Sequence, residues 1–124
     1  MQQKSLSIRP FIGAKNFEIS CSFYRDLGFE EFLVEPKLCL FKSGELAFYL
    51  QDYYSKEWVE NTMIFMEVES VNEFYKELLA LDLPEKYKDV RLVPIRVEQW
   101  GSECFLHDPS GVLWHFGEFS QNHT

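Results

Sequence analysis

The chain has 124 residues, enough for one domain with its own apolar core and no metal or disulfide support. Its 20 Asp and Glu against 12 Lys and Arg give a net charge of −8, which argues against nucleic acid or an anionic membrane as a direct partner. Aromatic residues make up 17% of the chain, so we expect some rings to line a ligand surface as well as the core.

The first half of the chain predicts a strand, a helix and three further strands, in that order. A strand-like run, SIRPFIGA (7–14), precedes FEISCSFYRDLGF (17–29), in which apolar residues recur at helical spacing. Three alternating segments follow: EEFLVE (30–35), KLCLFKS (37–43) and ELAFYLQ (45–51). Such alternation is typical of strands with one buried face.

The second half repeats this order. Its first strand-like run is NTMIFMEV, and the helical pattern is VNEFYKELLALDL, which shares Phe-Tyr with the first helix. The alternating segments are VRLVPIRVE, ECFLHD and VLWHFGEF. We therefore predict two βαβββ modules, approximately 6–52 and 62–119, within a single domain of residues 1–124.

The three cysteines, Cys21, Cys39 and Cys104, are odd in number, far apart in the sequence and placed inside apolar segments. This pattern favours buried thiols over a disulfide framework and fits a reducing compartment. The first residues contain no apolar signal core, and no stretch reaches membrane-spanning length. We therefore expect a cytoplasmic protein with no membrane partner.

Three motifs together resemble the glyoxalase/bleomycin resistance superfamily, also called vicinal oxygen chelate proteins: FYRDLGF, ENTMIFMEV followed by EFYKEL, and EQWGSECFLHDPSGVLWHF. They look most like the bleomycin resistance proteins, and the match covers almost the whole chain. The D-P-x-G turn alone is shared by the whole superfamily, whereas its combination with EQWG is more specific. The resemblance implies an α+β fold, in which two tandem βαβββ modules form a cupped mixed sheet with helices on its outer face.

The resemblance also allows a prediction about metal. Metal-dependent members supply His or Glu from the first and last strand of each module, pointing into the cup. The corresponding positions here are Pro10, Tyr49, Met63 and His115. Only His115 carries a metal-ligating side chain, and one imidazole does not hold a catalytic divalent ion. His107, at the turn, and His123, in a polar tail, do not complete the set, so we expect no metal and no other cofactor.

Alternation along the strands predicts which side chains share the cup face with these four positions. The additional cup-facing residues are expected to be Ile12, Gln51, Phe65, Leu113 and Gly117. The residues expected to face the helices are Phe48, Leu50, Ile64, Met66, Trp114 and Phe116. This assignment separates Trp114, a core residue, from Trp100, which lies in a loop at the rim.

In the bleomycin resistance proteins, the matching tryptophan of the W-G pair stacks on the flat tail of the drug, in a groove between two subunits. The resemblance thus implies a homodimer in which Trp100 and Phe65 bind a planar, cationic ligand and Phe32 or Phe41 of the other chain closes the groove. Pro10, which cannot donate a backbone hydrogen bond, would mark the hinge of a swapped N-terminal strand. The expected ligand-binding residues are Phe32, Phe41, Tyr49, Gln51, Phe65, Trp100, Glu103 and His115.

The function we expect is metal-independent binding and sequestration of a bleomycin-type glycopeptide antibiotic, without chemical change to it. Glu98 and Glu103 would attract the cationic end of the ligand, or would simply be solvated strand residues. Two other functions remain open at this stage. One is a metal-dependent enzyme of the same superfamily, of the glyoxalase or dioxygenase type, and the other is binding of a different aromatic small molecule.

Overall fold

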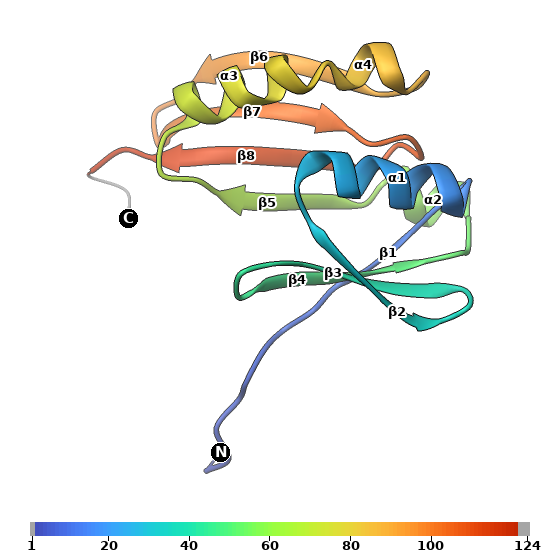
Figure 1. Cartoon of the computed structure of the whole chain (residues 1–124). Coiled ribbons are helices and arrows are strands. Elements are labelled where there is room, and N and C mark those ends of the chain that lie inside the picture. Colours follow the sequence, from blue (N-terminus) through green and yellow to red (C-terminus); the bar gives the residue numbers. More distant parts are fainter. Residues whose placement is uncertain (1, 122–124) are drawn as a thin grey trace.

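The first half of the chain forms a four-stranded mixed sheet in the computed structural model, which describes residues 2–121 (Figure 1). Its strands are β1 (Phe11–Gly13), β2 (Glu30–Glu35), β3 (Leu38–Ser43) and β4 (Leu46–Gln51). They are arranged in the order β1-β4-β3-β2, with β1 parallel to β4 and the other pairs antiparallel. The His123 discussed above lies outside the described residues.

The second half forms another four-stranded mixed sheet with the same arrangement. Its strands are β5 (Met63–Glu67), β6 (Arg91–Val97), β7 (Gly101–His107) and β8 (Leu113–Phe119). They are arranged in the order β5-β8-β7-β6, and β5 runs parallel to β8. The predicted α+β class is confirmed, and the strands form two four-stranded mixed sheets.

One long helix follows the first strand of each sheet. Helix α1 (Phe17–Leu27) begins after Asn16, whose Oδ1 accepts a hydrogen bond from the backbone of Ile19, and it ends at Gly28, with a φ of 113°. Helix α3 (Val71–Leu81) has Ser70 as its N-terminal cap. Two short helices complete the chain, α2 (Lys56–Val59) and α4 (Leu83–Lys86). Within residues 2–121, no helix has the length and apolar character needed to cross a bilayer.

The two sheets share one apolar core. Phe48 of β4 and Trp114 of β8 are almost completely buried, and their ring centroids lie 5.4 Å apart. Tyr24 of α1 contacts both rings, at 4.9 and 5.8 Å. The helix-facing side of each sheet is therefore turned toward the other sheet. The opposite sides, here called the open faces, are directed away from this core.

The D-P-S-G turn joins α1 to this core through a buried hydrogen-bond network. Tyr24 donates from its hydroxyl to Asp108 Oδ2 at 2.6 Å, and Trp114 Nε1 donates to the same hydroxyl at 2.9 Å. Asp108 Oδ1 accepts from the backbone of Ser110 and Val112. Burial raises the pKa of Asp108 above its ordinary value, while these donors act in the opposite direction. The turn therefore has a structural role in this chain.

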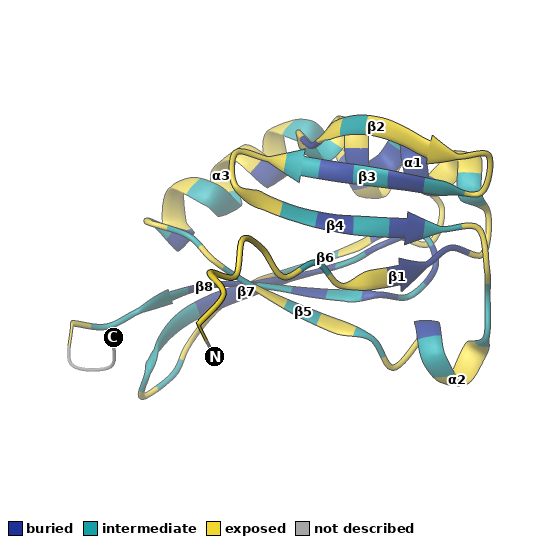
Figure 2. Cartoon of the chain, turned by 90° about the horizontal axis from the view of Figure 1, so that it is seen from below, coloured by how far each residue is buried: buried dark blue, intermediate teal, exposed yellow. Residues whose placement is uncertain are grey.

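The predicted alternation is confirmed along β4, β5 and β8. Phe48, Leu50, Trp114 and Phe116 are buried in the core, and Ile64 and Met66 pack against it. Figure 2 shows the same pattern along β3 and β4, where buried and partly buried residues alternate, whereas most of β2 is exposed. Each of these strands thus has one side buried in the core and one side that is more exposed, as its sequence predicts.

Two predicted orientations are wrong. Ile12 was expected on the cup face, but β1 pairs with β4 so that Ile12 lies opposite Leu50, and it is fully buried. Phe41 was expected to close the ligand groove, but it lies opposite Phe48 on the core side of β3 and is fully buried. Its ring stacks on Phe48 at 5.6 Å, so it contributes to the core.

Candidate functional site

The open face of the second sheet carries a row of chemically distinct side chains. Phe65 of β5 and Phe105 of β7 are the register neighbours of His115 on β8, on either side of it. Glu103, two residues before Phe105, is 8% exposed, and its Oε1 lies 3.1 Å from His115 Nδ1. Arg96 lies opposite Glu103 on β6, and its guanidinium sits 5.6 Å from the centre of the Phe105 ring. A nearly buried carboxylate is thus paired with an imidazole among aromatic rings.

At one end of this row, three rings form an aromatic cluster made of Phe65, Trp100 and Phe119. Their ring centroids lie 5.4 to 5.9 Å apart. Gly117 makes room for them, because a Cβ at that position would lie 2.5 Å from the Phe65 ring and 3.2 Å from the Trp100 ring. Phe65 remains 45% exposed, so the cluster offers a ring surface to a ligand.

The backbone of the β6–β7 hairpin positions Trp100. Glu98 and Gly101 exchange hydrogen bonds, N to O at 2.7 Å and at 3.3 Å, which closes a tight turn around Trp100. A Cβ on Gly101 would collide with the backbone carbonyl of Glu118. Glycine is therefore required directly after Trp100, because a side chain at this position would prevent β7 from approaching β8.

The open face of the first sheet carries a second row, in the register order Phe32, Leu40, Tyr49 and Phe11. Phe11 stacks on Tyr49 at 4.7 Å, and Arg9 donates from Nη1 to the Tyr49 hydroxyl at 3.1 Å. Phe32 is 43% exposed. This row is more open to solvent than the row on the second sheet.

The structure brings together only part of the predicted site within one chain. Phe65, Trp100, Glu103 and His115 share the second sheet. Tyr49, Gln51 and Phe32 belong to the first sheet, whose open face points away from the shared core on its own side. Within one chain the two rows therefore lie on different sheets, and the roles of these residues in binding stay predictions.

Three aromatic residues on the open faces were not predicted from the sequence. Phe105 and Phe119 follow from alternation along β7 and β8, because they have the same parity as Glu103 and His115. Phe11 was missed because β1 was placed in the wrong register. The pairing of His115 with Glu103 also depends on the β7–β8 register, which the loop between these strands does not reveal in the sequence.

An apolar groove with a volume of about 580 Å³ is lined by residues of β4 and β5, Phe65 among them. Its lining includes Phe48 and Trp114 of the core and the acidic residues Glu45, Glu67 and Glu69. Trp114 is only 2% exposed and offers little ring surface to a ligand in this groove. The open face at Phe65 has the exposed rings, so we regard it as the stronger candidate.

The four positions expected to match superfamily metal ligands do not form a ligand set. His115 has Glu103 beside it, and Met63 lies two residues before Phe65 with its side chain 64% exposed. Among the described residues, the group of three His, Cys, Asp or Glu side chains close enough to share an ion is Cys21, Glu31 and Cys39. That group lies between α1 and the first sheet, apart from the open faces.

The fold is similar to those of solved bleomycin-binding proteins and of a lactoylglutathione lyase. No family model and no curated protein matches the sequence. A bleomycin-binding protein of Streptomyces verticillus, solved with copper(II)-bleomycin, matches with a TM-score of 0.80 and 20% identity over 96% of this chain and 100% of its own. Another bleomycin-binding protein, complexed with bleomycin, gives a TM-score of 0.77, 18% identity and coverage of 92% and 98%. Lactoylglutathione lyase from Agrobacterium tumefaciens gives a TM-score of 0.71, 19% identity and coverage of 94% and 96%.

Proposed function

We propose that this protein binds and sequesters a planar, cationic small molecule of the bleomycin type, without metal and without altering it chemically. The observation that carries the proposal is the aromatic cluster of Phe65, Trp100 and Phe119, which presents an exposed ring beside a nearly buried carboxylate. A flat ligand stacks on such rings, and each stacked pair contributes about 0.5–1.5 kcal/mol beyond the area that it buries.

Charge supports the same class of ligand. Glu103 is the register neighbour of Gly117, beside which the Phe65 and Trp100 rings lie, and the chain as a whole carries a net charge of −8. A cationic ligand is attracted over a distance by this field and finds a local partner in the carboxylate. Fold similarity to two bleomycin-binding proteins points in the same direction, at 18% and 20% identity.

The proposal includes a homodimer. Because the open faces of one chain point away from its shared core, Phe32 and Tyr49 can reach the aromatic cluster only from a second chain. The N-terminal segment leads away from the body of the chain (Figure 1), and its Leu6 and Ile8 are 87% and 93% exposed. Apolar side chains this exposed favour contact with a partner, with Pro10 as the hinge of the swapped strand.

A metal-dependent enzyme of the same superfamily is the second candidate. The His115–Glu103 pair favours it, since imidazole and carboxylate are both metal ligands, and the fold is also that of lactoylglutathione lyase from Agrobacterium tumefaciens. Cys39 belongs to the other group of possible metal ligands, so Cys39→Ser serves as the control for binding at that group. A divalent ion that is bound by the wild type and by Cys39→Ser, but not by His115→Ala, would favour this enzyme over the binding protein.

Calorimetric titration with bleomycin tests the first proposal directly. We expect saturable binding of both the metal-free and the copper-loaded drug, because the stacking tail does not depend on the metal. A titration without heat or fluorescence change for both forms would exclude bleomycin as the ligand. The cytoplasmic location stays a prediction of the sequence.

A further inference from the structure

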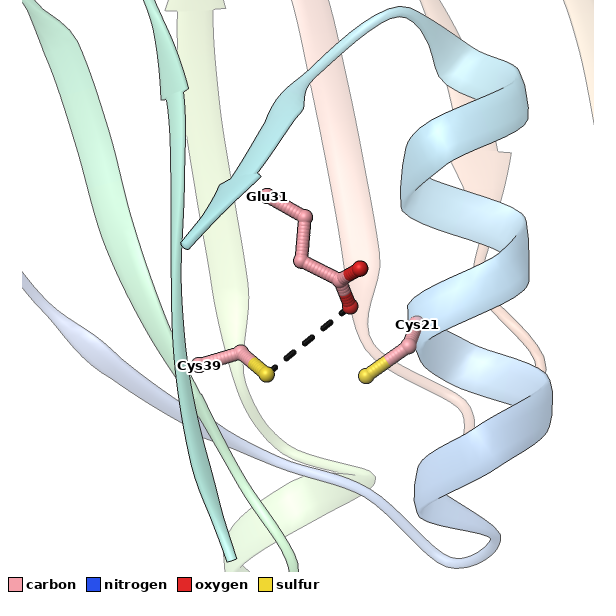
Figure 3. Close-up of side chains that lie close together, drawn as sticks. All are labelled: Cys21, Glu31 and Cys39. Atoms are coloured by element: carbon pink, nitrogen blue, oxygen red, sulfur yellow. Dashed lines mark hydrogen bonds between the residues drawn. The ribbon is translucent and has the colours of Figure 1, made fainter. Parts of the chain in front are cut away.

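Two buried cysteines and one glutamate meet between α1 and the first sheet (Figure 3). Cys21 comes from α1, Glu31 from β2 and Cys39 from β3, and one ligand atom of each lies within 4.8 Å of the other two. Cys21 is 6% exposed and Cys39 is 3% exposed. Their sulfur atoms and a Glu31 oxygen point into the same space in Figure 3. This site is independent of the open faces and of the function proposed for them.

The spacing of these atoms matches a tetrahedral zinc site. Cys39 Sγ lies 3.8 Å from Glu31 Oε2. In a tetrahedral site with Zn–S and Zn–O distances of about 2.3 and 2.1 Å, a sulfur and an oxygen ligand stand about 3.6 Å apart. The other pairs in the cluster lie within 4.8 Å, so small side-chain rotations bring three ligands to bonding distance. Two thiolates and a carboxylate are donors that suit zinc.

Arg25 orients the carboxylate for this role. Its Nη1 lies 2.8 Å from Glu31 Oε1, so Oε2 is the oxygen left toward the cysteines. A carboxylate ligand held by an outer hydrogen-bond donor is the arrangement that supports metal sites generally. The charges also balance, because two thiolates, one carboxylate, the arginine and a divalent ion sum to zero.

We propose that Cys21, Glu31 and Cys39 bind one Zn²⁺ ion per chain. Both thiols release their protons to solvent on binding, and no electron is transferred. The Glu31 side chain is 27% exposed, which gives the ion a path to the site and leaves room for water as a fourth ligand. The ion would tie α1 to the β2–β3 hairpin. Burial raises the pKa of both thiols, which keeps them neutral in the metal-free protein.

The experiment uses Co²⁺ as a spectroscopic probe of the full-length, reduced, tag-free protein. We expect a thiolate-to-cobalt charge-transfer band that saturates at one ion per chain and is displaced by Zn²⁺. Cys21→Ser and Cys39→Ser should each weaken the band strongly, and Glu31→Gln should weaken binding at least tenfold. Arg25→Gln should weaken it less, because it removes an orienting contact and not a ligand.

Cys104→Ser is the matched control, because Cys104 is also a buried thiol but lies on the second sheet. It should keep the full band, and far-ultraviolet circular dichroism checks that every variant is folded. A band lost in Cys104→Ser and kept in the Cys21→Ser, Cys39→Ser double variant would overturn the proposal. So would the absence of any thiolate band in the wild type, or thiols that form a Cys21–Cys39 disulfide in place of binding metal.

Discussion

The open faces of the two sheets differ in how far their side chains are already organised. On the second sheet, Glu103 and Phe105 are each 8% exposed and are held by neighbouring rings and His115. On the first sheet, Phe11 and Phe32 are 49% and 43% exposed, and most of β2 is open to solvent (Figure 2). An organised face binds a small ligand with little ordering cost, whereas an exposed apolar face suits a protein partner. Under the function proposed above, the ligand floor would lie on the second sheet, where Phe65 stays 45% exposed beside this organised row, and the partner contact would lie on the first.

The largest effect is expected on the free energy of unfolding, and it tests whether both sheets are stabilised by one shared core. Trp114→Ala should lower the free energy of unfolding by about 3–5 kcal/mol, because it removes a fully buried ring and the donor to Tyr24. Denaturant unfolding monitored by circular dichroism measures this loss. A loss below about 1 kcal/mol would show that the sheets do not share the core described here.

The second prediction tests the N-terminal segment, which leads into β1 of the first sheet, as a partner contact. Removing residues 1–9 deletes Leu6 and Ile8, and burial of each such side chain contributes about 1.5–3 kcal/mol. We expect a dimer at micromolar concentration for the full chain and at least a hundredfold higher dissociation constant after truncation, measured by light scattering across a dilution series. A monomeric full chain would contradict the dimer, and a dimer unaffected by truncation would contradict only the swapped strand.

The third prediction tests the second sheet as the ligand floor. Trp100→Ala should weaken bleomycin binding by about 1–3 kcal/mol and change stability much less, because the Trp100 ring packs against Phe65 and Phe119 outside the apolar core. Trp100→Phe should keep part of the affinity, since a smaller ring still stacks.

Trp58 on α2 is the matched control for the third prediction, because it packs against Tyr53 away from the aromatic cluster. Trp58→Ala should leave the affinity for bleomycin unchanged in the same calorimetric titration. Equal loss of binding and stability in Trp100→Ala would mean that Trp100 is structural and that the ligand floor lies elsewhere.

The fold could be predicted from the sequence because alternation and helical spacing are local signals. The side that Phe48, Trp114 and Phe116 face follows directly from them. Ile12 was assigned wrongly because a three-residue strand is too short to fix its own register, which β4 determines here. Phe41 was assigned wrongly because an exposed and a buried ring look alike in a sequence, and only the pairing with Phe48 settles its side.

The site was less predictable than the fold for a related reason. A sequence period shows which residues share one side of a strand, but not which sheet that side will face. The way in which the two sheets and their helices share one core depends on contacts such as that between Phe48 and Trp114, which the sequence does not reveal. The Cys21, Glu31 and Cys39 cluster was missed for the same reason, since these residues lie on three different elements.

The smallest expected effect on ligand binding is that of metal removal. Chelation with EDTA should leave bleomycin affinity unchanged, because stacking on Phe65 and Trp100 needs no ion. The zinc site between α1 and the first sheet predicts that chelation lowers thermal stability in the wild type and has no such effect in Cys39→Ser. The two measurements report on different sheets. Bleomycin affinity reports on the second sheet, and the change in thermal stability on chelation reports on the first. Loss of affinity on chelation in Cys39→Ser would place a functional metal at His115 and would favour the enzyme.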